Sequence, residues 1–299
     1  MKLQIIYKNT NKPYGGSNQF LKALKERLIE LDLYENSSEK SEVFIFNSHN
    51  EYDEAIKLKK LFPEKIFIHR VDGPMKLYNN MSDNRDDMVY KLNKISNGTI
   101  FQSKYSFDNN IKLGMRIPEK YSIIGNFCDN NIFKTKKTIR TNSKIRIIST
   151  SFSTNPKKGF ATYKFLDDYL DFSKYEYVFA GNSSVNFRNI RMLGRLDSKQ
   201  LALELYNSDI YITASENDPC SNSLIEAQTV GLPTIALNSG GHSEIINKNG
   251  ELYELKEELL EKIHKISDNL SEYFSQKSKI EPNTIAKRYI EFIRSLQIK

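Results

Sequence analysis

Residues 215–227 read SENDPCSNSLIEA, and GLPTIA follows at 231–236 and GGHSEII at 240–246. The apolar run before Ser215 ends there, which predicts that a strand stops and that a polar loop with acidic side chains follows. Ser221 and Asn222 are residue types that cap a helix, so a helix is expected from about this point. In open α/β sheets, ligands bind at the carboxyl ends of strands, where such loops lie.

The same segment carries candidate ligand-binding groups. A helix N-terminus exposes free N–H groups and the positive end of the helix dipole, which suit a diphosphate or sugar hydroxyls. Glu226, about one turn into the expected helix, could accept hydrogen bonds from the vicinal hydroxyls of a ribose. The alternatives are a solvated helix residue for Glu226, a helix-capping acid for Glu244, and an ordinary loop residue for Cys220, which has no histidine near it in sequence.

Strands and helices alternate on both sides of this segment, which predicts parallel sheets with helices on their faces. We expect strands at 3–7, 43–47, 65–71, 99–103 and 121–125, and again at 145–150, 176–180, 209–214 and 233–238. We expect helices at 17–33, 51–61, 159–170, 198–206, 222–230, 255–274 and 284–296. With 299 residues, the pattern predicts two Rossmann-like α/β domains in tandem.

The expected domains are 1–135 and 145–280, joined by a linker at 136–144, with a last helix at 281–299 that packs back on the N-terminal domain. The stretch from Lys134 to Lys144 contains no acidic residue and has no periodicity, which is typical of a linker. A basic patch for nucleic acid is the alternative. A linker is favoured because no aromatic residue is interleaved and no nucleic-acid-binding motif accompanies the stretch.

Composition sets broad limits on location and partners. The net charge of +7 and the pI of about 9.0 would favour anionic partners such as nucleotide diphosphates or acidic lipids. Cys128 and Cys220 lie far apart, so neither a disulfide framework nor a zinc site is indicated. No stretch approaches the ~20 apolar residues of a membrane span. We therefore expect a cytoplasmic protein without nucleic acid, and peripheral contact with a membrane stays open.

Together these segments resemble the retaining family 4 glycosyltransferases of the GT-B fold (glycosyl transferases group 1). The donor loop of that family reads Glu, seven residues, Glu, then a turn and Gly-Gly-x-x-Glu. Glu226 matches the second acid, Asp218 stands at the first, and Glu216 competes with it. The resemblance implies two Rossmann-like domains facing a cleft. It also implies that the N-terminal domain, 1–135, is the acceptor side. A nucleotide-sugar donor is then bound by the C-terminal domain, with contacts from Pro219, Cys220, Ser221, Asn222 and Ser223.

Residues 151–159, SFSTNPKKG, resemble the loop where the family places an arginine and a Lys-Gly that hold the donor diphosphate. Lys158 matches the lysine, and Lys157 is a substitute for the arginine, whose position is Ser153. A lysine there could stabilise the negative charge that grows on a leaving diphosphate. The resemblance also assigns Asn182 to the donor. The alternative for the two lysines is solvent exposure before a helix.

Two segments of the N-terminal half resemble the remaining parts of the family's site. PYGGS at 13–17 looks like its glycine-rich loop, with Gly15 and Gly16 next to the donor, although glycines suit any tight strand–helix turn. His69 and Asp72 stand where the family commonly has a histidine or an acid facing the transferred sugar. Their alternatives are a core histidine and a turn acid before Gly-Pro.

The resemblance implies transfer of a hexosyl or N-acetylhexosaminyl group to a saccharide, lipid-linked or protein acceptor, with retention of anomeric configuration. Catalytic roles fall to His69, Asp72, Lys158 and Asp218. The sequence contains no Asp-x-Asp pair for a metal–diphosphate complex, so neither a metal nor a cofactor is expected. The alternatives are a nucleotide-sugar epimerase of the same architecture and a non-catalytic protein that binds nucleotide-sugars or other anions. A nicotinamide-dependent dehydrogenase is disfavoured because its glycine fingerprint is absent.

Overall fold

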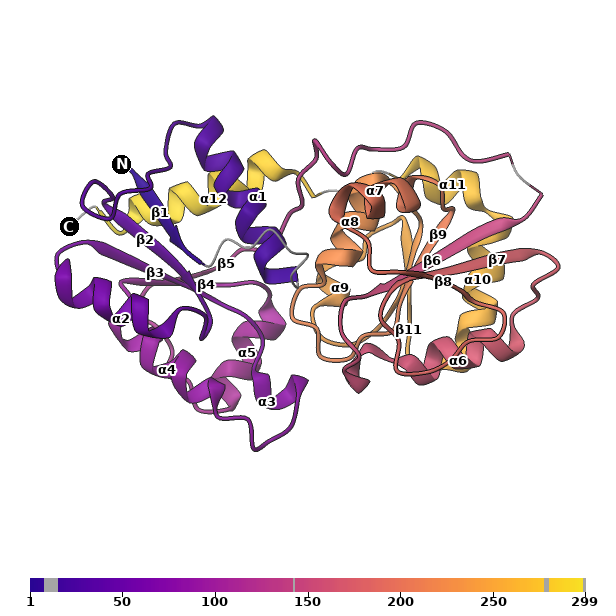
Figure 1. The fold of residues 1–299 in the computed structure, drawn as a ribbon, viewed down its shortest axis with the longest axis horizontal. Coiled ribbons are helices and arrows are strands. Elements are labelled where there is room, and N and C mark those ends of the chain that lie inside the picture. Colours follow the sequence, from indigo (N-terminus) through magenta and orange to yellow (C-terminus); the bar gives the residue numbers. More distant parts are fainter. Residues whose placement is uncertain (8–15, 142, 277–279, 298–299) are drawn as a thin grey trace. The chain divides into compact units, whose positions relative to one another are not determined.

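The computed structural model describes residues 1–7, 16–141, 143–276 and 280–297. They form two compact α/β units (Figure 1). The first unit contains the described residues up to Phe127 and those from Glu281 onward, and the second runs from Cys128 to Ile280. The sequence places the end of the first domain near residue 135, and in the structure the change of unit falls at Phe127.

The first unit is built on a five-stranded sheet in which all neighbouring strands are parallel, in the order β1-β2-β3-β4-β5. β2 and β3 are almost wholly buried, as expected for strands covered on both faces, although β3 includes His69 and Arg70. The strands are β1 (Leu3–Ile6), β2 (Val43–Asn47), β3 (Ile66–Val71), β4 (Gly98–Phe101) and β5 (Tyr121–Ile123).

Helices cover both faces of this sheet. α1 packs against α12, with Phe20 touching Tyr289, and α2 packs against α4 on the opposite face (Figure 1). The C-terminal helix α12 therefore belongs to the first unit, although it follows the second unit in sequence. The helices are α1 (Gly16–Glu30), α2 (Tyr52–Leu61), α3 (Met75–Tyr78), α4 (Arg85–Ile95), α5 (Lys104–Lys112) and α12 (Pro282–Ser295).

The second unit is built on a six-stranded parallel sheet in the order β11-β10-β9-β6-β7-β8. Its strands are β6 (Ile145–Ser151), β7 (Tyr175–Gly181), β8 (Arg191–Gly194), β9 (Ile210–Thr213), β10 (Thr234–Leu237) and β11 (Gly250–Tyr253). Its helical segments are η1 (Pro156–Lys158), α6 (Phe160–Tyr169), α7 (Ser198–Tyr206), α8 (Asn222–Val230), α9 (His242–Ile245), η2 (Lys256–Glu258), α10 (Leu259–Asp268) and α11 (Leu270–Ser275).

Every strand expected from the sequence, and every expected helix except the one over 255–274, is confirmed to within a few residues at each end. The helix expected over 255–274 is instead divided into η2, α10 and α11, with a break at Asn269. The sequence pattern missed β8, β11, α3, α4, α5 and α9. β8 is an edge strand whose residues are largely exposed, so it lacks the apolar run that reveals a buried strand.

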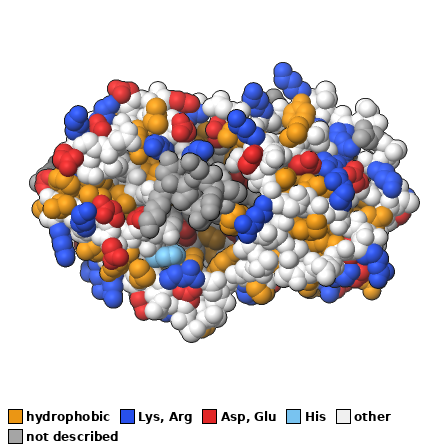
Figure 2. Space-filling view, in the orientation of Figure 1, with side chains coloured by type: hydrophobic (Ala, Val, Ile, Leu, Met, Phe, Trp, Pro, Cys, Tyr) orange, Lys and Arg blue, Asp and Glu red, His pale blue; other side chains and the backbone are white. Residues whose placement is uncertain are grey.

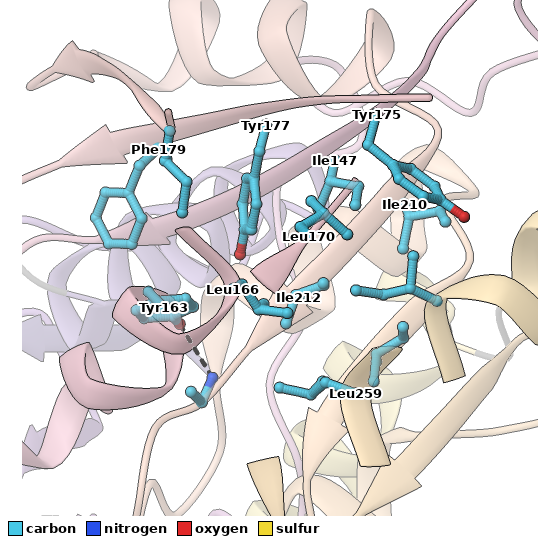
Figure 3. Close-up of a cluster of buried hydrophobic side chains, with 14 of the residues drawn as sticks. Ile147, Tyr163, Leu166, Leu170, Tyr175, Tyr177, Phe179, Ile210, Ile212 and Leu259 are labelled. Carbon is cyan, nitrogen blue, oxygen red and sulfur yellow. Dashed lines mark hydrogen bonds between the residues drawn. The ribbon is translucent and has the colours of Figure 1, made fainter. Parts of the chain in front are cut away.

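Buried tyrosines fix the end of β9 in the second unit (Figure 3). The hydroxyl of Tyr163 on α6 accepts a hydrogen bond of 3.0 Å from the backbone N–H of Ala214. The Tyr177 hydroxyl lies 2.7 Å from Ser149 Oγ, which donates to the Ile212 carbonyl at 2.6 Å. A buried hydroxyl needs such a partner, so these rings both fill the core and hold the backbone that leads into the loop after β9.

The chain between the two units is attached to the second unit. Lys136 Nζ donates to the Ser208 carbonyl at 2.8 Å and lies 3.5 Å from Asp209, and both charged side chains are 4% exposed. Arg140 also pairs with Asp209, at 2.8 Å. The stretch predicted to be a linker therefore begins with a buried ion pair. Its first residue, Lys136, pairs with Asp209, which lies 73 positions later in the sequence.

Asp167 on α6 has a buried carboxylate that is hydrogen-bonded to the backbone of a neighbouring loop. Its fully buried carboxylate accepts backbone hydrogen bonds from Arg188, Asn189 and Ile190 at 2.7–2.8 Å. Burial acts to raise the pKa of Asp167, but these bonds and Lys164 outweigh it and lower the pKa to about 2. A folded-state pKa below the unfolded value adds stability at neutral pH that is lost as the pH falls from about 4 towards 2.

We expect Asp167→Asn to lower the unfolding free energy by about 2 kcal/mol near neutral pH in urea titrations. The neighbouring Asp168 is 42% exposed and pairs with the same lysine, so Asp168→Asn should cost less than about 0.5 kcal/mol. Equal losses in the two variants would contradict this account of Asp167.

Candidate functional site

The loops that follow β6 and β9 lie against each other at the carboxyl ends of these adjacent strands. The backbone N–H of Glu216 donates to the Lys157 carbonyl at 2.7 Å. Gly159 has a φ of 77°, and a Cβ atom there would lie 2.2 Å from the Ala214 carbonyl oxygen. Any larger residue would therefore push the two loops apart. The contact brings Lys157 and Lys158 next to the acidic residues of the second loop.

Each of these lysines is paired with one acid. Lys157 Nζ lies 2.6 Å from Glu216, and Lys158 Nζ lies 3.3 Å from Asp218. The second pair is the more buried, with side chains 18% and 15% exposed. Burial acts to raise the pKa of Asp218, but the charges of Lys158 and His242 outweigh it and lower the pKa. Asp218 is therefore ionised at neutral pH, and the pair is electrically neutral.

A third loop, which follows β10, contacts the backbone of Asp218. The Asp218 carbonyl accepts a hydrogen bond of 2.8 Å from the N–H of Gly241. A Cβ atom on Gly240 would lie 2.2 Å from the same carbonyl oxygen, so this position also requires glycine. His242 is fully buried and its Nδ1 lies 2.8 Å from the Leu237 carbonyl. The two glycines therefore allow the loop after β10 to approach the backbone of Asp218 closely.

Helix α8 presents Glu226 beside this cluster of loops. The helix begins at Asn222 with Ser221 at the N-cap, whose side chain makes no capping hydrogen bond. Tyr211 donates to Ser223 Oγ at 2.8 Å, and Ser221 Oγ lies 3.3 Å from Ser223 Oγ. Glu226 is 7% exposed, and its carboxyl group has neither a hydrogen bond nor an ion pair among the described residues.

Burial raises the pKa of Glu226 to about 8. An isolated buried carboxyl group is costly when ionised, so most of it is protonated at pH 7. In that state it has one O–H donor and acceptor oxygens, the groups that two adjacent hydroxyls of a ligand would use. This isolated carboxyl group is the observation that most directly indicates a ligand.

Ser153 lies in the loop after β6, and Asn182, which directly follows β7, is hydrogen-bonded to that loop. Asn182 donates from its backbone N–H to the Ser151 carbonyl at 2.8 Å and from Nδ2 to the Phe152 carbonyl at 2.5 Å. Ser153 accepts from Ser151 Oγ through its carbonyl at 2.7 Å. Sequence reasoning missed Arg195, which donates to Asn182 Oδ1 at 3.2 Å and lies over the Phe152 ring at 5.3 Å.

The structure corrects the catalytic assignment of His69. This side chain is fully buried, its ring stacks on Phe46 at 4.7 Å, and its Nε2 lies 3.0 Å from the Ser48 carbonyl. Burial lowers the pKa of His69 to about 3, so the imidazole is neutral. Since no ligand can reach it, His69 is the core histidine that the sequence offers as its alternative.

Asp72 lies at the carboxyl end of β3 in the first unit, with a side chain that is 13% exposed. Gly15 lies outside the described residues, and Gly16 is the first residue of α1. The second unit brings together Lys157, Lys158, Asp218 and the residues of α8. Two first-unit residues that sequence reasoning missed, His49 and Arg70, lie near Asp72.

No helix in the described ranges is long and apolar enough to cross a membrane. In the same ranges, no group of three or more His, Cys, Asp or Glu side chains could hold a metal ion. On the face shown in Figure 2, basic and acidic side chains are interspersed, so the net charge of +7 does not form a single basic patch there.

Residues 183–281 match the model of the family described as Glycosyl transferases group 1. This segment contains α8, Asp218 and the Gly-Gly turn. No curated protein sequence matches the chain.

The chain is similar to solved structures of glycosyltransferases along nearly its whole length. HepE from Anabaena, solved with UDP and glucose, is 15% identical with a TM-score of 0.75, over 99% of this chain and 100% of HepE. A glycosyltransferase from Rickettsia africae is 15% identical with a TM-score of 0.68, over 99% and 98% of the two chains. Sucrose-phosphate synthase from Thermosynechococcus elongatus is 13% identical with a TM-score of 0.68, over 93% and 78%. The fold is therefore the GT-B fold of glycosyltransferases.

The raised pKa of Glu226 predicts how stability depends on pH. Because the folded state holds its proton up to about pH 8, wild type loses stability as the pH rises from about 4.5, by at most about 1.4 kcal/mol per pH unit. Glu226→Gln removes this loss. The unfolding temperature of the variant should therefore rise relative to wild type between about pH 5 and pH 8.5.

Glu244→Gln is the matched control, because Glu244 is exposed in the same unit. Its difference from wild type should not change over this pH range. A constant difference for Glu226→Gln as well would contradict the assignment of a raised pKa to Glu226.

Proposed function

We propose that this protein is a group 1 glycosyltransferase that binds a nucleotide-diphosphate sugar on its second unit. The observation that carries the proposal is the isolated, buried Glu226 on α8, at the same sheet edge as Lys157 and Lys158. The family match over 183–281 and the GT-B fold support it. HepE was solved with UDP, so UDP is the nucleotide to test first.

In this proposal, the donor diphosphate binds Lys157 and Lys158 in competition with Glu216 and Asp218. The Lys157 pair is partly exposed, with side chains 37% and 44% exposed, so separating it costs little. The N-terminus of α8 supplies backbone N–H groups for a phosphate oxygen, with Asn222 and Ser223 in its first turn. Glu226 holds the ribose hydroxyls. Asn182, Ser153, Pro219, Cys220 and Ser221 complete the proposed donor contacts.

We further propose transfer of a hexosyl or N-acetylhexosaminyl group with retention, without a metal. Negative charge grows on the diphosphate as the glycosidic bond breaks, and a fixed Lys158 would stabilise it more in the transition state than in the ground state. Asp218, released from Lys158, would face the sugar that is transferred. The acceptor hydroxyl would attack from the face that the diphosphate leaves.

Lys158→Ala tests this mechanism. Loss of a charge that acts mainly in the transition state should lower kcat by about 100-fold and change the donor KM by much less. The measurement is release of UDP from a panel of UDP-sugars. Lys174→Ala is the control, because Lys174 is 72% exposed and should leave both parameters unchanged.

Unchanged turnover in Lys158→Ala would reject the role of this lysine. The same reaction, run with EDTA, tests metal independence, which requires full activity in the chelator. NMR of the isolated product tests retention, and an inverted anomeric configuration would refute it.

A further inference from the structure

His242 is a buried histidine of the second unit, and one of its two ring nitrogens has no hydrogen-bond partner. The side chain is fully buried at the first position of α9, and its Nδ1 atom lies 2.8 Å from the Leu237 carbonyl oxygen. A carbonyl oxygen only accepts hydrogen bonds, so Nδ1 carries the proton and Nε2 is the basic nitrogen of the neutral ring. Nε2 is buried and makes no hydrogen bond among the described residues. A buried polar atom of this kind requires an explanation.

The charged groups that face this imidazole belong to the candidate donor site. Burial lowers the pKa of His242, so the ring is neutral at pH 7. Asp218, from the loop after β9, acts to raise this pKa, and Lys158, from the loop after β6, acts to lower it. On α8, which packs against α9, the titratable group is Glu226, which is mostly protonated at pH 7. Glu244, on α9 itself, is exposed.

In the ligand-free protein, Lys158 is the counter-ion of Asp218. Their charged atoms lie 3.3 Å apart, and the two side chains are 18% and 15% exposed. In the proposed function the donor diphosphate takes this lysine, and the negative charge of Asp218 is then left in a largely buried place. A buried charge without a partner is unfavourable, so the site needs a new cation beside Asp218. His242 is close enough to interact electrostatically with this carboxylate, and its basic nitrogen is free to take a proton.

We propose that His242 takes up a proton at Nε2 when the donor diphosphate removes Lys158 from Asp218, and that the imidazolium replaces the lysine as the counter-ion. The proton comes from the solvent, and the N–H bond is the only covalent bond that forms. The departure of the lysine charge and the remaining charge of Asp218 both favour the protonated ring. Donor binding is thus coupled to the uptake of one proton, and Asp218 stays ionised. The inference rests on the proposed glycosyltransferase function and adds a positioning residue to its donor site.

The protonation state of His242 can be measured by ¹⁵N NMR, because the ring nitrogens of a neutral imidazole and of an imidazolium have different chemical shifts. The chain has four histidines, and the signals that disappear in His242→Asn identify this one. The asparagine amide keeps a donor for the Leu237 carbonyl but cannot titrate. Without ligand, we expect a neutral ring at pH 7 with its proton on Nδ1. With saturating UDP, the pKa of His242 should rise and the protonated fraction at pH 7 should increase.

Two variants separate the effects of the lysine and of the acid. Lys158→Ala removes the counter-ion without any ligand, so the pKa of His242 should already be raised in the ligand-free variant. Asp218→Asn removes the charge that favours the imidazolium, so the ring should stay neutral at pH 7 with and without UDP. His264→Gln is the control, because His264 is exposed on α10 and should leave the signals of His242 unchanged.

Calorimetry measures the proton uptake itself. UDP is titrated into wild type and His242→Asn between pH 6.5 and 8.5, in buffers that differ in ionisation enthalpy. Protons exchanged by UDP and by Glu226 are common to both proteins, so the difference between them isolates His242. Wild type should take up more protons than the variant, by at most about one per UDP. Its affinity for UDP should also fall more steeply as the pH rises, by up to about tenfold per pH unit.

Three results would each overturn the inference while UDP binding stays intact. They are a pKa of His242 that does not rise with UDP, a pKa that does not rise in ligand-free Lys158→Ala, and equal proton uptake in wild type and His242→Asn. The last result would mean that another group takes the proton. Absence of UDP binding to wild type would instead overturn the proposed function, and the inference with it.

Discussion

The contact between Gly159 and the Ala214 backbone is the constraint on which the candidate site depends. It lets the loops after β6 and β9 share a backbone hydrogen bond, from Glu216 to the Lys157 carbonyl. Tyr163 fixes the Ala214 backbone from the core, so the position of the loop is set by packing and not by the loop itself. The lysines and acids of the second unit are therefore close together before any ligand binds.

The acidic groups of the candidate site in the second unit are of two kinds. Glu216 and Asp218 pair with the two lysines, and exchange of these carboxylates for a diphosphate keeps the lysines paired. Glu226 is held instead in a buried place without a partner, which destabilises the folded chain when the carboxyl group ionises. Such a group is unfavourable for stability alone, and we interpret it as a requirement of ligand binding.

The sheets and the second-unit cluster were predictable from sequence because each rests on a local pattern. Buried strands are apolar runs, and loops at the carboxyl ends of adjacent parallel strands must meet, which placed Lys158, Asp218 and α8 together. His69 was predicted wrongly because β3 is covered on both faces and is buried from Phe67 to Val71, and sequence alone did not show that the end of this strand is covered. Arg70 was missed because two of its partners, Asn47 and Asn126, lie far away in sequence. His49 and Arg195 were missed because the groups near them come from other segments of the chain.

The most direct test of the account is a crystal structure of the protein grown with UDP. The account predicts the diphosphate on Lys157 and Lys158 at the N-terminus of α8, with both ribose hydroxyls hydrogen-bonded to Glu226. Lys158 would then have left Asp218 for a phosphate oxygen. UDP bound away from α8, or a Glu226 carboxyl group that stays without a partner while UDP is bound, would contradict the assignment of this site.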